Sequence, residues 1–246
     1  MSTQRADVST LLGHLSAVSL ERARRDKSPE LAARVQAIKH YQQRRFAHTY
    51  ADLLASPRYG PAVRFFMDEL YGPQDFTRRD SQFARVVPAL VLLFPRQIVE
   101  MVNTLGELHA LSEALDSRMG KAFQGKVVDA PAYGGAWRAT GGVAKRNRQI
   151  ALTLQVGAAL DALTRKPLLR GSLHLMRGPA QAAGLKELQQ FLEAGFDTFK
   201  ALQGATEFLA LVNEREKRLA AALFAGDGAG TVIDGAASKR ALSMLP

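Results

Sequence analysis

Two adjacent arginines stand in the first turn of an expected helix, where an anion would be bound. Arg78 and Arg79 follow position 77, which is expected to cap this helix in a capping box with Asp80. Free backbone N–H groups at a helix start and two guanidinium groups together suit a phosphate or a carboxylate. The carboxylates of Asp75 and Asp80 would instead neutralise the arginines, and we favour such an internal ion-pair network. If an anion is bound here, Arg78, Arg79 and the nearby Tyr71 are the residues expected to hold it.

A histidine lies on the apolar face of another expected helix. At about 100° per residue, His109 falls within the stripe of apolar residues that precede it, and Glu113 and Asp116 follow on the same side. Such a grouping could orient a general base or supply ligands to a metal or haem. The helix has neither the two-histidine spacing of a zinc site nor the paired acidic motif of a di-iron site, so we predict no metal. A core histidine bonded to Glu113 or to a neighbouring helix is the favoured interpretation.

Basic side chains form one band of a short amphipathic segment. The band consists of Lys166, Arg170, His174 and Arg177, and leucines occupy the other side together with Met176. This segment could lie on anionic lipid or bind an acidic partner. We favour packing of the apolar side into the core, which would leave the basic band in solvent as a candidate anionic-partner surface.

One further arginine falls close to the apolar face of its helix. Arg45 lies near this face, and Asp52 is expected near the same edge. A buried Arg45–Asp52 ion pair would explain the arginine without a functional role.

Helical periodicity runs through nearly the whole chain, and no alternating strand pattern appears. Ser28 and Pro29 are a typical helix start, because serine caps and proline suits the first turn. Helices are expected over about 28–56, 61–71, 77–93, 94–119, 137–163, 167–177, 180–202 and 205–224. Residues 120–136 are rich in glycine, proline and small side chains and are expected to form a loop.

The predicted fold class is therefore all-α, without a sheet. About eight helices would form a multi-helix bundle or a globin-like packing. Residues 1–224 are expected to be a single helical domain that contains the loop, and residues 225–246 a flexible C-terminal tail.

Composition limits the chemistry. The absence of cysteine excludes disulfides, thiolate nucleophiles and cysteine-based metal sites. The longest apolar run, from Val86 to Phe94, is far shorter than the roughly 20 residues that cross a bilayer, and the N-terminus lacks a secretory signal pattern. We expect a cytoplasmic protein that is not transmembrane. The formal net charge of +10 is concentrated in residues 120–148, with six basic residues against one acid, and in residues 162–178, with four against none.

Two strings carry a resemblance to a family. Residues 65–80 read FFMDELYGPQDFTRRD, and this string resembles one found in uncharacterised proteobacterial proteins. A second such string is similar to residues 166–170 and 176–180, KPLLR and MRGPA. The resemblance implies no activity, cofactor or site residue.

The leading functional hypothesis is a noncatalytic helical binding or regulatory protein that engages an anionic ligand or an acidic protein partner. It depends on the segregated basic charge and on the lack of a motif that would fix a reaction, so an enzyme is not favoured. The alternative is a helical cofactor-binding sensor or enzyme, with a pocket near His109, Arg78 and Arg79 between their two helices, although no cofactor can be named. A weak, nonspecific nucleic-acid binder ranks third.

Overall fold

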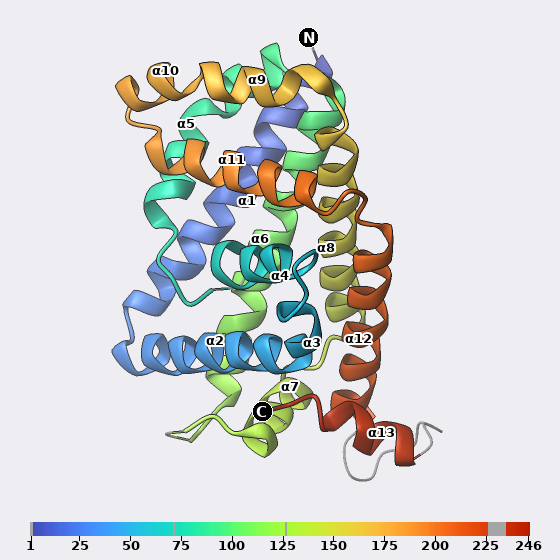
Figure 1. The fold of residues 1–246 in the computed structure, drawn as a ribbon. Coiled ribbons are helices and arrows are strands. Elements are labelled where there is room, and N and C mark those ends of the chain that lie inside the picture. The colour runs from blue at the N-terminus through green and yellow to red at the C-terminus, as the bar shows by residue number, and fades with distance from the viewer. Residues whose placement is uncertain (1, 71, 126, 226–234) are drawn as a thin grey trace.

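The computed structural model describes residues 2–70, 72–125, 127–225 and 235–246, and within these ranges the chain is helical without a strand (Figure 1). The helices are α1 (Ser2–Asp26), α2 (Pro29–Thr49), α3 (Ala51–Leu54), α4 (Gly60–Phe65), the π-helical turn η1 (Phe66–Leu70), α5 (Thr77–Leu93), α6 (Arg96–Ala122), α7 (Ala130–Thr140), α8 (Val143–Thr164), α9 (Pro167–Leu175), α10 (Arg177–Ala182), α11 (Lys186–Ala201), α12 (Thr206–Ala225) and α13 (Gly235–Leu242). The all-α prediction is confirmed, whereas the helix number of about eight is too low.

The centre of the fold is α6, which packs against α1, α2 and α8, while α8 also packs against α11 and α12. Figure 1 shows α1, α6, α8 and α12 running along the long axis of the molecule, with α2, α9 and α11 crossing them. Buried side chains such as Leu11 and Leu15 of α1 pack with Val99 and Val102 of α6. Helices α1 and α6, which are far apart in the sequence, therefore share one buried cluster.

Two helix starts test the capping predictions. Ser28 caps α2 as expected, since its Oγ accepts a hydrogen bond from the backbone N–H of Leu31 at 3.3 Å. The capping box predicted for α5 does not form: Phe76 stands at the N-cap position, and the Asp75 carboxylate accepts from the backbone N–H of Thr77 at 2.9 Å. The carboxylate of Asp80 is engaged elsewhere, with groups from α1 and α6.

Several predicted boundaries are wrong. The helix expected to reach position 56 ends at Thr49, and the loop expected over residues 120–136 contains the start of α7. Asp129 caps α7, because its Oδ1 accepts from the backbone N–H of Ala132 at 2.9 Å. Gly141 and Gly142, with φ of +59° and +83°, separate α7 from α8, and such positive values suit glycine.

Part of the C-terminal segment, over which we expect a flexible tail, is helical. Residues 235–242 form α13, which packs against α12, and Ala241 is buried. The hydroxyl of Thr49 donates to the carbonyl of Met244 at 3.1 Å, which ties the end of the chain to α2.

None of the helices in the described residues combines the length and the hydrophobicity needed to cross a lipid bilayer.

Candidate ligand-binding site

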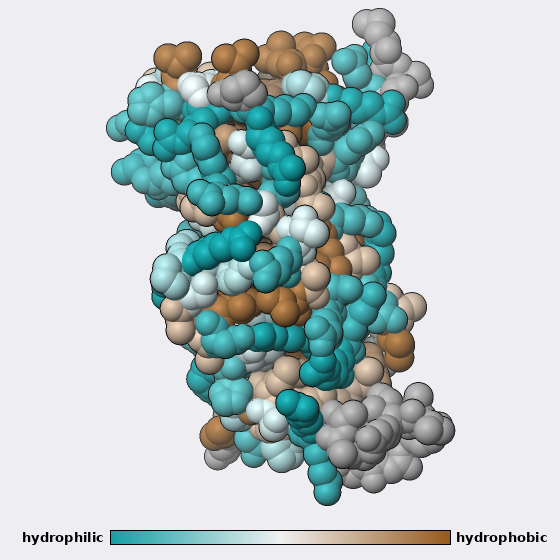
Figure 2. Space-filling view, turned by 45° about the vertical axis from the view of Figure 1, so that its right-hand side comes forward, coloured by the Kyte–Doolittle hydropathy of each residue, from teal (hydrophilic) through white to brown (hydrophobic). Residues whose placement is uncertain are grey.

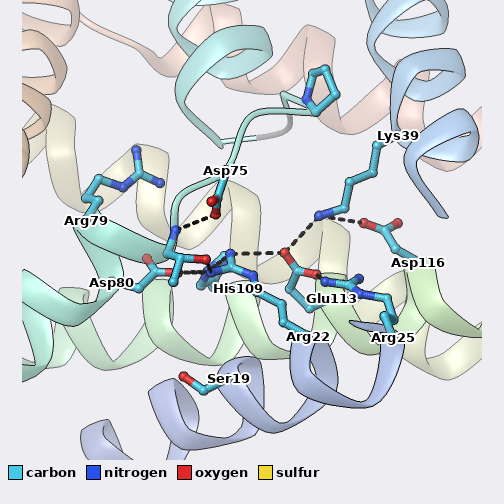
Figure 3. A network of polar contacts seen from close by, with 12 residues as sticks. Ser19, Arg22, Arg25, Lys39, Asp75, Arg79, Asp80, His109, Glu113 and Asp116 are labelled. Carbon is cyan, nitrogen blue, oxygen red and sulfur yellow. Dashed lines mark hydrogen bonds and ion pairs between the residues drawn. The ribbon is translucent and has the colours of Figure 1, made fainter. Parts of the chain in front are cut away.

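An Asp–His pair joins α5 to α6. His109 lies on α6, and its Nε2 is 2.9 Å from Oδ2 of Asp80 in the first turn of α5. Arg22 of α1 reaches the same Oδ2 with Nη1 at 2.9 Å, as Figure 3 shows. Nε2 lies closer to the Asp80 carboxylate, at 2.9 Å, than to Nη2 of Arg22, at 3.3 Å, so we assign its proton to the hydrogen bond with Asp80. Nδ1 then has no hydrogen-bond partner among the described residues. Burial opposes the charge of Asp80, but the hydrogen bond from His109 and the charges of His109, Arg22 and Arg79 prevail and lower its pKa.

A buried glutamate continues this arrangement toward α2. Glu113 has a side chain only 3% exposed, and its Oε2 lies 2.5 Å from Nη2 of Arg25. Its Oε1 accepts from Nζ of Lys39 at 2.8 Å and from Nη2 of Arg22 at 3.2 Å. Burial alone would raise the pKa of this carboxyl, but the charges of Lys39, Arg25 and Arg22 outweigh it and lower the pKa to about 2. Glu113 is therefore ionised at neutral pH.

Asp116 ends the arrangement and behaves differently. Burial, its largest influence, raises the pKa of this carboxyl; the negative charge of Glu113 adds to the effect and Lys39 opposes it. Lys39 Nζ is 3.9 Å from Oδ2, and Gln42 donates to Oδ1 at 3.1 Å. We call the charged network the set Arg22, Arg25, Lys39, Asp80, His109, Glu113 and Asp116. Its three cations face three carboxylates, so removal of one member would leave a buried charge without its partner.

An apolar cavity of about 110 Å³ adjoins the charged network at Asp80 and His109. Side chains of α1, α4, α5, α6, α8 and α11 line it, and its walls include Phe65, Phe83, Leu105, Leu108, Leu160 and Phe191. Arg79, Asp80, His109 and Ser112 supply the polar part of the lining. A cavity of roughly 150 Å³ with apolar walls accepts benzene, so this space has the size of a small organic group.

Arg79 is fixed at the wall of the cavity by stacking. Its guanidinium carbon lies 4.0 Å from the ring centre of Phe76 and 4.2 Å from that of Phe191. Nη1 and Nη2 donate to the carbonyl of Glu69 at 3.1 Å, and Nη1 also reaches the Glu69 carboxylate at 3.1 Å. Glu69 lies in η1, and π-helical turns are frequent at functional sites. The Nε–H of Arg79 makes no hydrogen bond to the described residues.

The predicted ligand-binding residues are only partly brought together. Arg79 and His109 line the same cavity, between the two helices expected to flank a pocket. Arg78 does not line this cavity; its side chain is 79% exposed, with Nε 3.0 Å from the carboxylate of Glu187. Tyr71 lies outside the described residues. Among the residues that the structure describes, no group of three or more His, Cys, Asp or Glu side chains is placed to hold a metal ion.

The basic band on α9 and α10 points toward acids of α11. Arg170 makes paired hydrogen bonds to Asp197 at 2.6 and 2.9 Å, and Arg177 binds Glu193 at 2.6–2.8 Å. Lys166 donates to the side chain of Gln97 at 2.6 Å, and His174 lies in the small surface hollow between Arg170 and Arg177. The favoured interpretation of a core-facing apolar side is wrong for Leu168 and Leu175, which are 82% and 77% exposed. The carboxylates that pair with Arg170 and Arg177 lie on α11, outside the amphipathic segment, so the basic band faces α11.

The buried arginine predicted to pair with Asp52 has another partner. Arg45 Nη1 lies 2.5 Å from Oε1 of Glu216 on α12, which also accepts from the hydroxyl of Tyr50 at 3.0 Å. Asp52 instead binds Arg215 of α12 at 2.6 Å and is more than half exposed. A helical wheel gives the face on which a residue lies but not the residue opposite it.

Sequence reasoning missed the network's cations. Arg22 and Arg25 lie on α1, a helix not among those expected, and Lys39 lies on α2. The spacing of Arg22 and Arg25, three residues apart, does place both on one helix face and is a signal that could have identified them. Their carboxylate partner lies 91 and 88 residues further along the chain, where no local pattern indicates it.

The chain belongs to a protein family described as Domain of unknown function (DUF8198), whose model matches residues 21–230. The match covers the charged network and every helix that lines the cavity except most of α1. No curated protein matches the chain, and no solved structure does.

Proposed function

We propose that this chain is a noncatalytic helical binding protein that holds a small, mainly apolar ligand with an anionic end in the cavity beside the charged network. The observation that carries the proposal is the combination of apolar walls with Arg79 and His109 in one cavity of about 110 Å³. Ligand sites are typically apolar, with few polar groups that fix orientation.

The polar lining favours an anionic end. Arg79 brings a guanidinium to the lining, and His109 brings an imidazole whose Nε2–H donates to Asp80. Hydrogen bonds between charged groups are stronger than neutral ones, so the guanidinium selects a carboxylate or similar anion over an alcohol. The walls contribute about 0.8 kcal/mol for each CH₂ group of the ligand that they bury.

The cavity is a better-supported binding place than the basic band. Arg170 and Arg177 are already paired with Asp197 and Glu193, so a ligand there would have to displace internal carboxylates. Arg79 and His109 are also bonded to carboxylates, those of Glu69 and Asp80, but the cavity adds apolar walls that would bind the rest of the ligand.

Native mass spectrometry of the purified protein, with two matched variants, tests the proposal. Leu105→Phe fills the cavity, whereas Leu111→Phe makes the same change two turns along α6, in the same apolar cluster but outside the cavity lining. We expect a bound small molecule in wild type and in Leu111→Phe and its loss in Leu105→Phe, with all three proteins folded by circular dichroism. A bound molecule retained in Leu105→Phe would place the site elsewhere, and wild type without one after saturation with candidate acids would reject the proposal.

A second candidate function is an enzyme in which His109 acts as a general base. The Asp80–His109 hydrogen bond of 2.9 Å favours it, since a carboxylate that orients an imidazole is the usual arrangement of such a base. Turnover distinguishes the two functions. The ligand is released by denaturing the protein and is then incubated with fresh protein: an enzyme would convert it into a product, and His109→Gln would abolish this conversion while still binding the ligand.

A further inference from the structure

One end of the molecule exposes large apolar side chains. We call this the apolar end; it consists of Leu92, Leu93, Phe94, Leu168, Leu175 and Met176. Leu93 and Leu168 are 73% and 82% exposed. Figure 2 shows hydrophobic side chains gathered at the top of the view, the end at which Figure 1 places α9. Monomeric proteins rarely expose a contiguous apolar patch of this kind unless it contacts something.

The two segments of the apolar end are neighbours in the fold. Lys166, just before α9, donates to the side chain of Gln97 at 2.6 Å, which fixes the start of α9 next to the start of α6. Leu169 packs against the buried cluster that contains Val91 of α5. The end of α5 and the outer side of α9 therefore form one surface rather than two isolated patches.

Basic residues outnumber acidic ones around the apolar end. Residues 84–99 and 162–178, the segments that carry the exposed leucines, contain six lysines and arginines and no aspartate or glutamate. Lys166 and Arg85 bind only neutral groups, the Gln97 side chain and the carbonyls of Ala183 and Gly184. The other four pair with carboxylates, Arg96 with Glu100, Arg165 with Asp161, Arg170 with Asp197 and Arg177 with Glu193, which leaves a net excess of two positive charges. The Arg96–Glu100 and Arg170–Asp197 pairs are exposed, and such pairs exchange partners at little cost.

We propose that the apolar end docks on the surface of an anionic lipid bilayer. The exposed leucines and Phe94 enter the boundary between headgroups and acyl chains, and Lys166, Arg165 and Arg96 contact lipid phosphates. An apolar centre with a basic rim is the pattern of a surface-bound amphipathic element. A second copy of the chain is disfavoured as the occupant, since two such ends would bring like charges together. The inference does not depend on the cavity ligand.

Vesicle flotation tests this inference on the full chain. The probes are vesicles of phosphatidylcholine alone and of phosphatidylcholine with phosphatidylglycerol. We expect wild type to float with the anionic vesicles and not with the neutral ones, and the bound fraction to fall as salt is raised.

Variants at exposed positions separate docking from folding. The double variant Leu168→Ser with Leu175→Ser should weaken vesicle binding about tenfold or more, because each leucine contributes apolar area to the interface. Leu20→Ser and Val143→Ser, on α1 and α8, remove similarly exposed apolar side chains away from the apolar end and should leave binding unchanged. Lys166→Gln should lower binding to anionic vesicles alone.

Three outcomes would overturn the inference. Wild type does not float with anionic vesicles, or it floats equally with neutral vesicles, or the control variants Leu20→Ser and Val143→Ser lose as much vesicle binding as the double variant Leu168→Ser with Leu175→Ser. A dimer in light scattering that Leu168→Ser dissolves, without vesicle binding, would assign the apolar end to a second copy instead.

Discussion

Two sets of ion pairs in this molecule use the same residue types and have opposite consequences. In the charged network, Glu113 is almost fully buried and is surrounded by Arg22, Arg25 and Lys39. On α9 to α11, Arg170 pairs with Asp197 at a comparable distance, but both side chains are about half exposed. Breaking a pair in the buried network leaves a charge without water around it, which is costly. In the exposed pairs, water and salt ions readily take the place of the partner charge. The comparison teaches that burial, rather than the number of charges, determines which basic residues hold the fold.

The largest effect is expected from Glu113→Gln. This substitution leaves the buried Arg25 without a carboxylate and takes one of two carboxylates from Arg22 and from Lys39, and we expect the free energy of unfolding to fall by about 3–5 kcal/mol. Urea denaturation followed by circular dichroism measures it. Asp197→Asn, which removes the half-exposed partner of Arg170, is the control and should change stability far less. Equal losses of unfolding free energy in the two variants would show that buried and exposed ion pairs do not differ in their contribution to stability.

Acid should destabilise the protein through the same residue. The pKa of Glu113 falls from its ordinary value of 4.5 to about 2 in the folded state, so its contribution is present above pH 4.5 and is lost as the pH falls toward 2. The gap corresponds to about 3 kcal/mol. Asp80, whose pKa is also lowered, acts in the same direction, while Asp116, whose pKa is raised, acts in the opposite one.

Urea denaturation at several pH values between 6 and 3 checks this dependence. We expect stability to fall with the pH in wild type and to fall less steeply in Glu113→Gln. Identical slopes in the two proteins would show that Glu113 is not the group that titrates.

A smaller loss is expected from His109→Ala. The substitution removes the hydrogen bond to Asp80 and leaves that carboxylate with Arg22, so we expect about 1–3 kcal/mol of destabilisation in thermal or urea unfolding. His48→Ala, at an exposed histidine that is 3.3 Å from the carbonyl of Ser243, should have little effect. A His109→Ala protein as stable as His48→Ala would mean that the Asp80–His109 bond contributes nothing to the fold.

The smallest effect is expected at the surface pairs. In a double-mutant cycle of Arg170→Gln and Asp197→Asn, the coupling measured by urea unfolding should be close to the experimental error and should vanish in 1 M salt. A coupling as large as that between Arg25 and Glu113 would contradict the comparison.

The sequence predicted local features well and long-range ones poorly. The cap at Ser28 and the position of His109 on a core-facing side follow from residues within a few turns, and both are found. The partner of His109 is on another helix, 29 residues away, and the partners of Glu113 lie on α1 and α2. No periodicity within one helix encodes which face of a second helix will oppose it.

The basic band illustrates the same limit in the other direction. Its amphipathic pattern is real, but the pattern does not say which side meets the protein. Asp197 and Glu193 of α11 attract Arg170 and Arg177, so Leu168 is left in solvent. A helical wheel drawn for the segment alone cannot predict that acidic residues from a later helix will pair with its basic side.

The binding cavity is tested most directly by NMR of the protein labelled at methionine methyl groups. Met101 lines the cavity, and Met176 is exposed on the apolar end, so the two methyls serve as probe and control. With benzoate as the probe molecule, we expect the Met101 signal to shift and saturate while Met176 stays in place, and Arg79→Gln to weaken benzoate more than toluene. A Met101 signal that neither molecule moves, or that moves equally in Leu105→Phe, would contradict a ligand site in this cavity.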